Sequence, residues 1–334
     1  MDAPISRSLQ TSRPRKPDSL KPGSLFTWYT RYLTIPDQKD CNSGCWKIRR
    51  VFLSLRKNLD VMILNEQISQ KTLDGMVSAA RQAQLTETAT GDHDRARLNA
   101  SFDSSSGKWL YAIPSPSIGT VLDNNTLRIA AGLRLGLSVC APHACTRCAT
   151  SVTARGHHGL SCSRSAGRHP RHRALNEVIS RALRSAGVPS QLEPAGLSRS
   201  SALRPDGMTL VSWTAGKPLV WDATVWDTFA PSHLALSARA AGGVAKLAER
   251  SKSSKYGELE SRYVVQPVAF ETLGVIGPST DSFLHDLGKR IERASGDRRA
   301  TEFLLQRVSI EIQRGNAAAV QGSLPTGDEL PGIG

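Results

Sequence analysis

RPDGMTLVSWTAGKPLVWDATV, residues 204–225, is the stretch of sequence that decides the fold. Residues 208–211 and 219–225 have the apolar, β-branched character that is typical of strands. Residues 214–217 lie between them, contain Gly216 and supply a turn. The sequence therefore predicts a β-hairpin at the centre of an α/β domain.

The second predicted strand has two different faces, because side chains alternate along a strand. One face is apolar and can pack on a core: Leu219, Trp221, Ala223 and Val225. The other face carries Val220, Asp222 and Thr224, so that Asp222 points across at Asp206, which opens the first strand. Two carboxylates that converge from adjacent strands can hold Mg²⁺ or Mn²⁺ through oxygen ligands. Such an ion lowers the pKa of a bound water and polarises a phosphoryl oxygen.

The residues after the hairpin predict helices and one further strand. A helical region that is interrupted at Gly242-Gly243 comes first, and residues 263–270 then form a third strand. Pro267 in this strand indicates an edge or a bulge. Two closing helices have their apolar faces at 283–291 and 303–312, with a glycine stop and an aspartate cap between them, Gly296 and Asp297.

A lysine in the helical region is a candidate partner of the two acids. Lys252 and Tyr256 are four residues apart and share one helical face, whereas Lys255 lies on another. A lysine beside a buried face needs a partner, and an acidic pair with a phosphate would provide one. On the residues alone, ordinary structural roles for Asp206, Asp222 and this lysine stay open.

A second constellation has the spacing of a metal site, Cys-x2-Cys-x9-His-x3-Cys. Its members are Cys145, Cys148, His158 and Cys162. Four such ligands suit tetrahedral Zn²⁺, and a closed site with four protein ligands is structural. Three residues compete for a place in the set: Cys140, His143 and His157. Four unrelated loop residues are the alternative.

The segment 163–173 is very basic, with four arginines and two histidines, and it opens a helix. The apolar face of this helix is Leu175, Val178, Ile179 and Leu183. The candidates for contact with nucleic acid are Arg168, Arg171, His172 and Arg173. A net charge of +14 favours a polyanionic partner, and the 5% of aromatic residues argues against a stacking platform for single strands. A solvated helix entry is the alternative reading of the basic segment.

The regions before the zinc spacing are predicted in less detail. Residues 1–65 are expected to be poorly ordered, apart from a plausible helix at 46–64 with Cys41 and Cys45 as free thiols beside it. Residues 66–140 predict a helical region, with a helix from about Gln67 and a short strand or turn at 107–114. Another helix follows through 127–135, and its candidate caps are Asn124, Asn125 and Thr126. The tail 319–334 is expected to be disordered.

Targeting signals are not found in the sequence. The basic stretch Arg13 to Lys16 is not followed by an apolar core, so it is not a secretory signal. We find no apolar run long enough to span a bilayer. A reducing compartment is the expectation, in which six cysteines indicate metal ligation or free thiols.

Taken together and in this order, the motifs resemble the C-terminal region of non-LTR retrotransposon proteins, where a Cys-Cys-His-Cys knuckle precedes a restriction-like endonuclease of the PD-(D/E)XK superfamily. The resemblance covers roughly residues 66–320. The matching pieces are the Cys/His set, Arg171-His172 with Leu175-Asn176, Arg204-Pro-Asp206, Val220 to Val225, and Lys252 to Tyr256.

The resemblance implies a restriction-endonuclease-like core at 201–318, a small mixed sheet flanked by helices, preceded by a zinc knuckle and basic helix at 141–200. It implies Asp206 and Asp222 as ligands of Mg²⁺ or Mn²⁺ and Lys252 as the catalytic lysine. The supporting residues would be Tyr256, Thr224 and Lys255. Thr224 stands where the family usually has its lysine, so a migrated lysine is needed, and Lys255 is the substitute for Lys252. The gaps between these motifs are longer than in the family.

The activity that the resemblance implies is nicking of double-stranded DNA in the nucleus, which exposes a 3′ hydroxyl that primes reverse transcription. Element RNA is a candidate second partner. We find no polymerase motif, so the chain is expected to be a fragment, a truncated copy or a separate gene. Two alternatives stay open: a zinc-knuckle nucleic-acid-binding module that does not cut, and a decayed reading frame.

Overall fold

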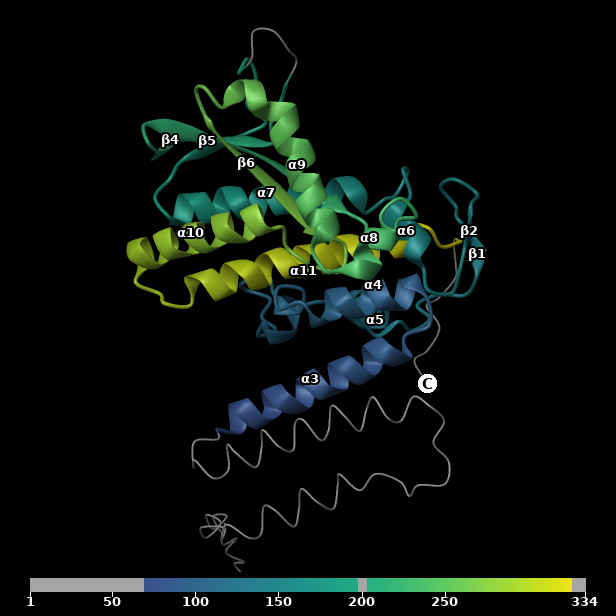
Figure 1. Cartoon of the computed structure of the whole chain (residues 1–334). Helices are drawn as coiled ribbons and strands as arrows, with labels where there is room; N and C mark the ends of the chain where they lie inside the picture. The colour runs from purple at the N-terminus through teal and green to yellow at the C-terminus, as the bar shows by residue number, and fades with distance from the viewer. Residues whose placement is uncertain (1–68, 198–202, 326–334) are drawn as a thin grey trace, which may run out of the picture. The chain divides into compact units, whose positions relative to one another are not determined.

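The computed structural model describes residues 69–197 and 203–325 (Figure 1). The chain divides into two compact units, Met1–Ala80 and Arg81–Gly334, and helix α3 (Gln70–Thr88) crosses the boundary. What the sequence predicts for residues 1–65, including Cys41 and Cys45, lies outside the described residues. In the described part of the chain, no helix is both long and apolar enough to cross a membrane. The fold described below is that of the second unit.

A small mixed sheet of four strands lies at the centre of this unit, in the order β3-β4-β5-β6. The strands are β3 (Ser190–Leu192), β4 (Gly207–Thr214), β5 (Lys217–Trp226) and β6 (Val264–Glu271). β3, β4 and β5 pair antiparallel, whereas β5 and β6 pair parallel. The predicted hairpin is confirmed, and its turn residues Ala215 and Gly216 both have positive φ, as tight hairpin turns require. Pro267 lies in an edge strand, as predicted.

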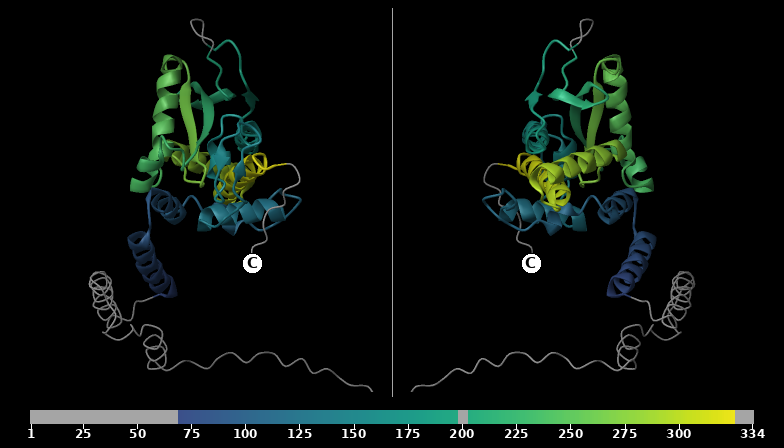
Figure 2. Two further views of the ribbon diagram at one scale, coloured as in Figure 1. Left: turned by 90° about the vertical axis from the view of Figure 1, so that its right-hand side faces the viewer. Right: turned by 90° about the vertical axis from the view of Figure 1, so that its left-hand side faces the viewer.

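Helices cover both faces of the sheet, as Figure 2 shows. On one face, Leu219, Trp221 and Ala223 pack in a core with α7 (Arg168–Ser185), α10 (Pro278–Ser295) and α11 (Ala300–Gln321). On the other face, Val220 packs with Tyr256 at the end of α9 (Gly243–Tyr256). Full burial of one large apolar side chain stabilises the fold by roughly 1.5–3 kcal/mol. Side chains therefore alternate along β5 as predicted, so that one face of the strand packs on α7, α10 and α11 and the other packs on α9.

The remaining elements complete the unit around this core. They are α4 (Asp92–Phe102), η1 (Lys108–Tyr111), α5 (Asn124–Leu135), β1 (His143–Ala144), β2 (Ser151–Val152), α6 (His157–Ser161), α8 (Leu234–Arg239) and η2 (Gly257–Leu259). The predicted interruption at Gly242-Gly243 separates α8 from α9, and Gly242 has a φ of 74°. Because α7 packs on the same core as the sheet, the regions 141–200 and 201–318 are not separate domains.

One prediction about the helical region before the sheet needs correction, and another is narrowed. Of the strand or turn predicted at 107–114, the structure has a 3-10 turn, in which Trp109 is buried against Ala130 and Ile310. The cap of α5 is Asp123, whose carboxylate accepts a hydrogen bond of 2.9 Å from the Thr126 amide. This cap lies one residue before the predicted candidates.

Two predictions about the last helix also need correction. The Asp297 carboxylate accepts a hydrogen bond from Arg299 two residues later and does not cap α11. The predicted tail boundary at residue 319 falls inside α11, which continues to Gln321 with Ala319 and Val320 buried. These buried residues pack on the segment that carries the cysteines, so the helix cannot end earlier without exposing apolar surface.

We predict that Gly207→Ala destabilises the unit. A Cβ atom at this position would lie 2.1 Å from the Trp221 ring, which is fully buried and cannot move aside. Overpacking of this kind costs about 1–3 kcal/mol. The control is Gly257→Ala, because Gly257 has helical dihedral angles and nothing within 4 Å of its added Cβ. Urea unfolding followed by circular dichroism checks the pair, and equal midpoints for the two variants would contradict the packing described here.

Candidate functional site

Two aspartates lie opposite each other where β4 begins beside β5. The register pairs Gly207 with Trp221, and one step further it places Asp206 opposite Asp222. Directly opposed residues of an antiparallel pair have Cβ atoms roughly 4.5–5.5 Å apart. Asp206 also reaches across to β5, where its Oδ2 atom accepts a hydrogen bond of 2.6 Å from the Ala223 amide. The structure therefore brings together the two acids that the sequence singles out.

Helix α9 brings a lysine and a tyrosine to the second acid. The Lys252 ammonium forms an ion pair with Asp222, and the Tyr256 hydroxyl donates a hydrogen bond of 2.5 Å to Asp222 Oδ1. Lys255, the substitute lysine, is exposed, and its ammonium donates to the Tyr256 hydroxyl at 2.9 Å. Of the two lysines, Lys252 is thus the one in contact with an acid. Thr224 is half-buried on the same strand as Asp222.

A histidine from α7 contacts the first acid. His172 Nε2 lies 2.9 Å from Asp206 Oδ2. This hydrogen bond raises the pKa of His172, although burial opposes the shift. Burial would raise the pKa of Asp206, but the hydrogen bond and charge of His172 and the Ala223 amide outweigh it and lower that pKa. Asp206 is therefore held as a carboxylate at neutral pH.

The tyrosine is held in its neutral form. Burial raises the pKa of Tyr256, and so do the hydrogen bond to Asp222 and the negative charges of Asp222 and Asp206. A neutral hydroxyl remains a hydrogen-bond donor, which is the form that a carboxylate acceptor needs. Tyr256 therefore fixes one oxygen of Asp222 without adding charge to the site.

The second acid is buried and paired with the lysine. Asp222 is 6% exposed, and its Oδ2 atom is buried without a hydrogen bond. Among the described residues, its contact is the ion pair with Lys252. Carboxylate oxygens are ligands that Mg²⁺ and Mn²⁺ prefer, but the Lys252 ammonium occupies Asp222 Oδ2, so a cation bound to both acids would have to displace it.

A shallow pocket opens beside Asp222. It has about 180 Å³ of empty space, part of it open to solvent. The polar residues that line it are Asp222, Lys252, Tyr256 and Gln266. The sequence interpretation missed Gln266, whose amide donates to the Ser279 hydroxyl at 3.1 Å and so ties one wall of the pocket to the start of α10. A glutamine on an edge strand gives no local signal of such a position.

Some side chains of the basic segment 163–173 are exposed to solvent, and one is buried in the core. Arg168 and Arg173 are exposed, whereas Arg171 is only 5% exposed and donates to Asn316 Oδ1 at 2.7 Å. Burial lowers the pKa of Arg171 to about 10, and the charge of Asp227 opposes the shift. The expectation that Arg171 contacts nucleic acid is therefore corrected: its guanidinium joins α7 to α11 inside the protein.

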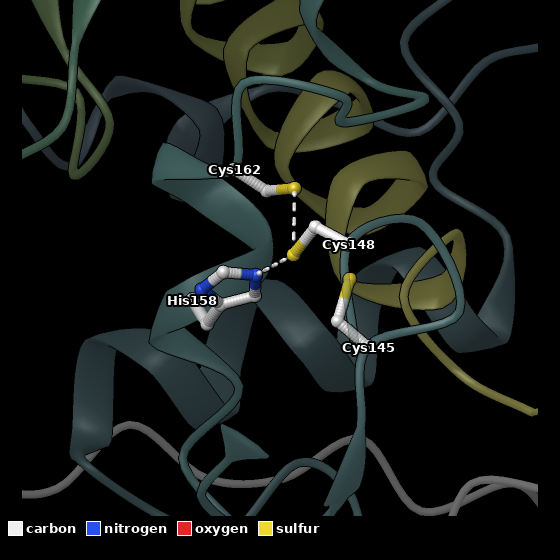
Figure 3. Close-up of side chains that lie close together, drawn as sticks. All are labelled: Cys145, Cys148, His158 and Cys162. Carbon is white, nitrogen blue, oxygen red and sulfur yellow. Dashed lines mark hydrogen bonds between the residues drawn. The ribbon is translucent and has the colours of Figure 1, made fainter. Parts of the chain in front are cut away.

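The predicted cysteine and histidine set is assembled in space, as Figure 3 shows. Its four ligand atoms all lie within 4.8 Å of one another: Cys145, Cys148, His158 and Cys162. The Cys148 and Cys162 sulfurs are 3.7 Å apart, and the Cys148 sulfur is 3.1 Å from His158 Nε2. Two sulfurs on a tetrahedral zinc would be about 3.8 Å apart, given Zn–S bonds of about 2.3 Å. The set can therefore hold a metal ion such as zinc.

Local structure explains why these four residues meet. Cys145 and Cys148 lie in the turn between β1 and β2, where Ala149 has a φ of 62° and its amide bonds back to the Cys145 carbonyl. His158 lies on α6, and Cys162 follows the end of that helix. The turn and the short helix thus present two ligands each.

The competing ligands have other partners. His157 stacks on Phe229 with ring centroids 3.9 Å apart, and burial lowers its pKa to about 4. Cys140 lies 3.5 Å from the Thr153 and Ala154 carbonyls. His143 contacts the Ala141 carbonyl and the Ser323 hydroxyl. His158 is therefore the histidine of the set.

Comparison with models of known protein families and with curated proteins finds no match to this chain.

We predict one bound transition-metal ion per chain at the four Cys/His ligands. Cys148→Ser should lose the ion and lower the unfolding temperature, because the set is built into a buried cluster. Cys140→Ser is the matched control, since Cys140 is buried nearby but bonds to backbone carbonyls. Elemental analysis and thermal unfolding check this. Full metal content in Cys148→Ser, or equal loss in both variants, would contradict the assignment.

Proposed function

We propose that the second unit is a metal-dependent DNA endonuclease domain of the restriction-like type. The observation that carries the proposal is the meeting of three groups from three elements: Asp206 before β4, Asp222 in β5 and Lys252 on α9. Such a group of two acids and an amine is suited to phosphodiester hydrolysis. The resemblance described from the sequence supports the same activity.

Each residue has a distinct role in this proposal. Asp206 and Asp222 hold Mg²⁺ or Mn²⁺, which when bound lowers the pKa of a water and polarises a phosphoryl oxygen. The Lys252 ammonium, a mobile donor of three hydrogen bonds, stabilises negative charge on the scissile phosphate. Tyr256 keeps Asp222 oriented through its short hydrogen bond.

The charge distribution supports double-stranded DNA as the substrate. The net charge of +14 suits a polyanion, because each lysine or arginine placed against a phosphate releases a counterion. Arg168 and Arg173 are exposed on the helix that carries His172, and Arg204 is exposed beside Asp206. We propose, following the resemblance, that a nick made in the nucleus primes reverse transcription, with element RNA as a second partner.

The Cys/His set has a structural role in this proposal. All four positions around a tetrahedral zinc would be taken by protein ligands, which leaves none for a substrate. Cys145 and Cys162 share a buried cluster with Ala319 and Val320 of α11. A bound zinc ion would therefore stabilise the contact between the Cys/His segment and α11, which packs on α7 and α10.

A nucleic-acid-binding module that does not cut is the second candidate. The ion pair between Lys252 and Asp222 favours it, because the lysine already neutralises the acid that a cation would need. A decayed reading frame that keeps the fold would behave in the same way. Salt-dependent DNA binding without cleavage under Mg²⁺ or Mn²⁺ would support this candidate.

We predict that Asp206→Ala and Lys252→Met each lower the nicking rate roughly 10²–10³-fold, the usual effect of removing a group that stabilises the transition state. The assay is conversion of supercoiled plasmid to open circle with Mg²⁺ or Mn²⁺. Asp286→Asn is the control, because Asp286 is half-exposed on α10 and pairs with Arg290 at 3.1 Å. Equal nicking by Asp206→Ala and the parent would end the endonuclease proposal.

A further inference from the structure

A chain of hydrogen bonds runs from the core to the first acid. The Trp221 indole donates to Asn176 Oδ1 at 3.0 Å, and Asn176 Nδ2 lies 3.4 Å from His172 Nδ1. His172 Nε2 then lies 2.9 Å from Asp206 Oδ2. His172 and Asn176 are one helical turn apart on α7, and Trp221 is the β5 residue next to Asp222. The chain thus joins the helix to the hairpin at the site.

The chemistry of the groups decides which atom donates and which accepts in each of these hydrogen bonds. An indole N–H is only a donor, so the atom of Asn176 that faces it must be the amide oxygen. The amide nitrogen then faces His172 and also lies within reach of the Asp206 carboxylate, and because it is only a donor, a neutral His172 accepts at Nδ1. The proton of a neutral imidazole is consequently on Nε2, from which it is donated to Asp206.

Burial protects the inner end of this series of hydrogen bonds. Trp221 is 0% exposed and Asn176 is 6% exposed, so water does not compete for these hydrogen bonds. The Trp221 ring also lies against Gly207, where an added Cβ would come within 2.1 Å of it. The residue directly after Asp206 is therefore held by the same side chain that orients Asn176.

Both ring nitrogens of His172 are engaged within the protein. Nε2 bonds to Asp206, and Nδ1 lies 3.4 Å from Asn176 Nδ2. The histidine therefore faces an acid of the site, and its contact with nucleic acid stays a prediction.

We propose that Trp221 and Asn176 hold His172 as the tautomer protonated on Nε2, and that His172 is thereby a positioning residue that orients the Asp206 carboxylate for cation binding. The proposal rests on the proposed function, in which Asp206 is a metal ligand. His172 and the Ala223 amide bond to the same carboxylate oxygen, so together they set the plane of the carboxylate. Loss of such a supporting group lowers metal affinity or activity roughly 10–100-fold.

The tautomer is tested without any activity measurement. In protein labelled with ¹⁵N-histidine, His172 should show a protonated Nε2 and an unprotonated Nδ1 at pH above its pKa. Trp221→Phe removes the indole donor, frees the Asn176 amide to rotate and should give mixed tautomers. Trp213→Phe is the matched control, because Trp213 packs on Phe283 and Arg290 and not on Asn176. A proton on Nδ1 in the parent, or no change in Trp221→Phe, overturns the proposal.

The positioning role is tested by comparing His172→Leu with His172→Gln. We expect His172→Leu to weaken Mn²⁺ binding, measured by titration calorimetry, roughly 10–100-fold. Glutamine has an amide N–H that can replace Nε2–H, so His172→Gln should restore most of the affinity. His169→Leu is the control, since His169 is exposed on the same helix. Parent-like Mn²⁺ affinity in His172→Leu overturns the proposal.

The two proposals fail in different ways. If the parent binds Mn²⁺ and His172→Leu does not, but the parent nicks no DNA, the endonuclease proposal fails and the positioning role stands. If the parent nicks DNA and His172→Leu nicks equally well, the positioning role fails alone. If His172→Leu does not fold, the tautomer in Trp221→Phe and the affinity of His172→Gln decide, and weak binding by His172→Gln counts against the proposal.

Discussion

The register of the β4–β5 hairpin is the constraint on which the rest of the structure depends. A slip of one residue would move every side chain of β5 to the opposite face. Trp221 would then face α9, and Asp222 would face the core formed with α7. The positive φ angles of Ala215 and Gly216 fix the turn, and Gly207 leaves room for the Trp221 ring. Because Gly207 pairs with Trp221, the preceding residue Asp206 comes to lie opposite Asp222.

The core extends without a break from the sheet to the Cys/His set. α11 packs on α7 and α10 along its first half, and its last turns pack on Cys145 and Cys162. Inside this path, Arg171 donates to Asn316, which in turn donates to the Thr272 carbonyl after β6. The segment that carries the Cys/His set is therefore part of the same folded unit as the two acids.

Local patterns predict much of the fold and of the site. The period-2 pattern predicts which β5 side chains face the core, and Pro267 predicts that β6 is an edge strand. The four-residue spacing of Lys252 and Tyr256 predicts that both lie on the face of α9 that contacts Asp222. The contact of His172 with Asp206 joins residues 34 apart in the chain, and no local pattern contains it. The burial of Arg171, in contrast, could have been predicted from the sequence. Arg171 lies four residues before Leu175 and therefore on the apolar face of α7.

The central claim, that Asp206 and Asp222 hold one divalent cation, is tested most directly by a crystal structure of the protein with Mn²⁺ and a short DNA duplex. Anomalous scattering identifies Mn²⁺ without reference to activity. The account predicts a peak shared by the two carboxylates, with the Lys252 ammonium moved from Asp222 to a phosphate oxygen. A structure with DNA bound, no anomalous peak and Lys252 still paired with Asp222 would contradict it.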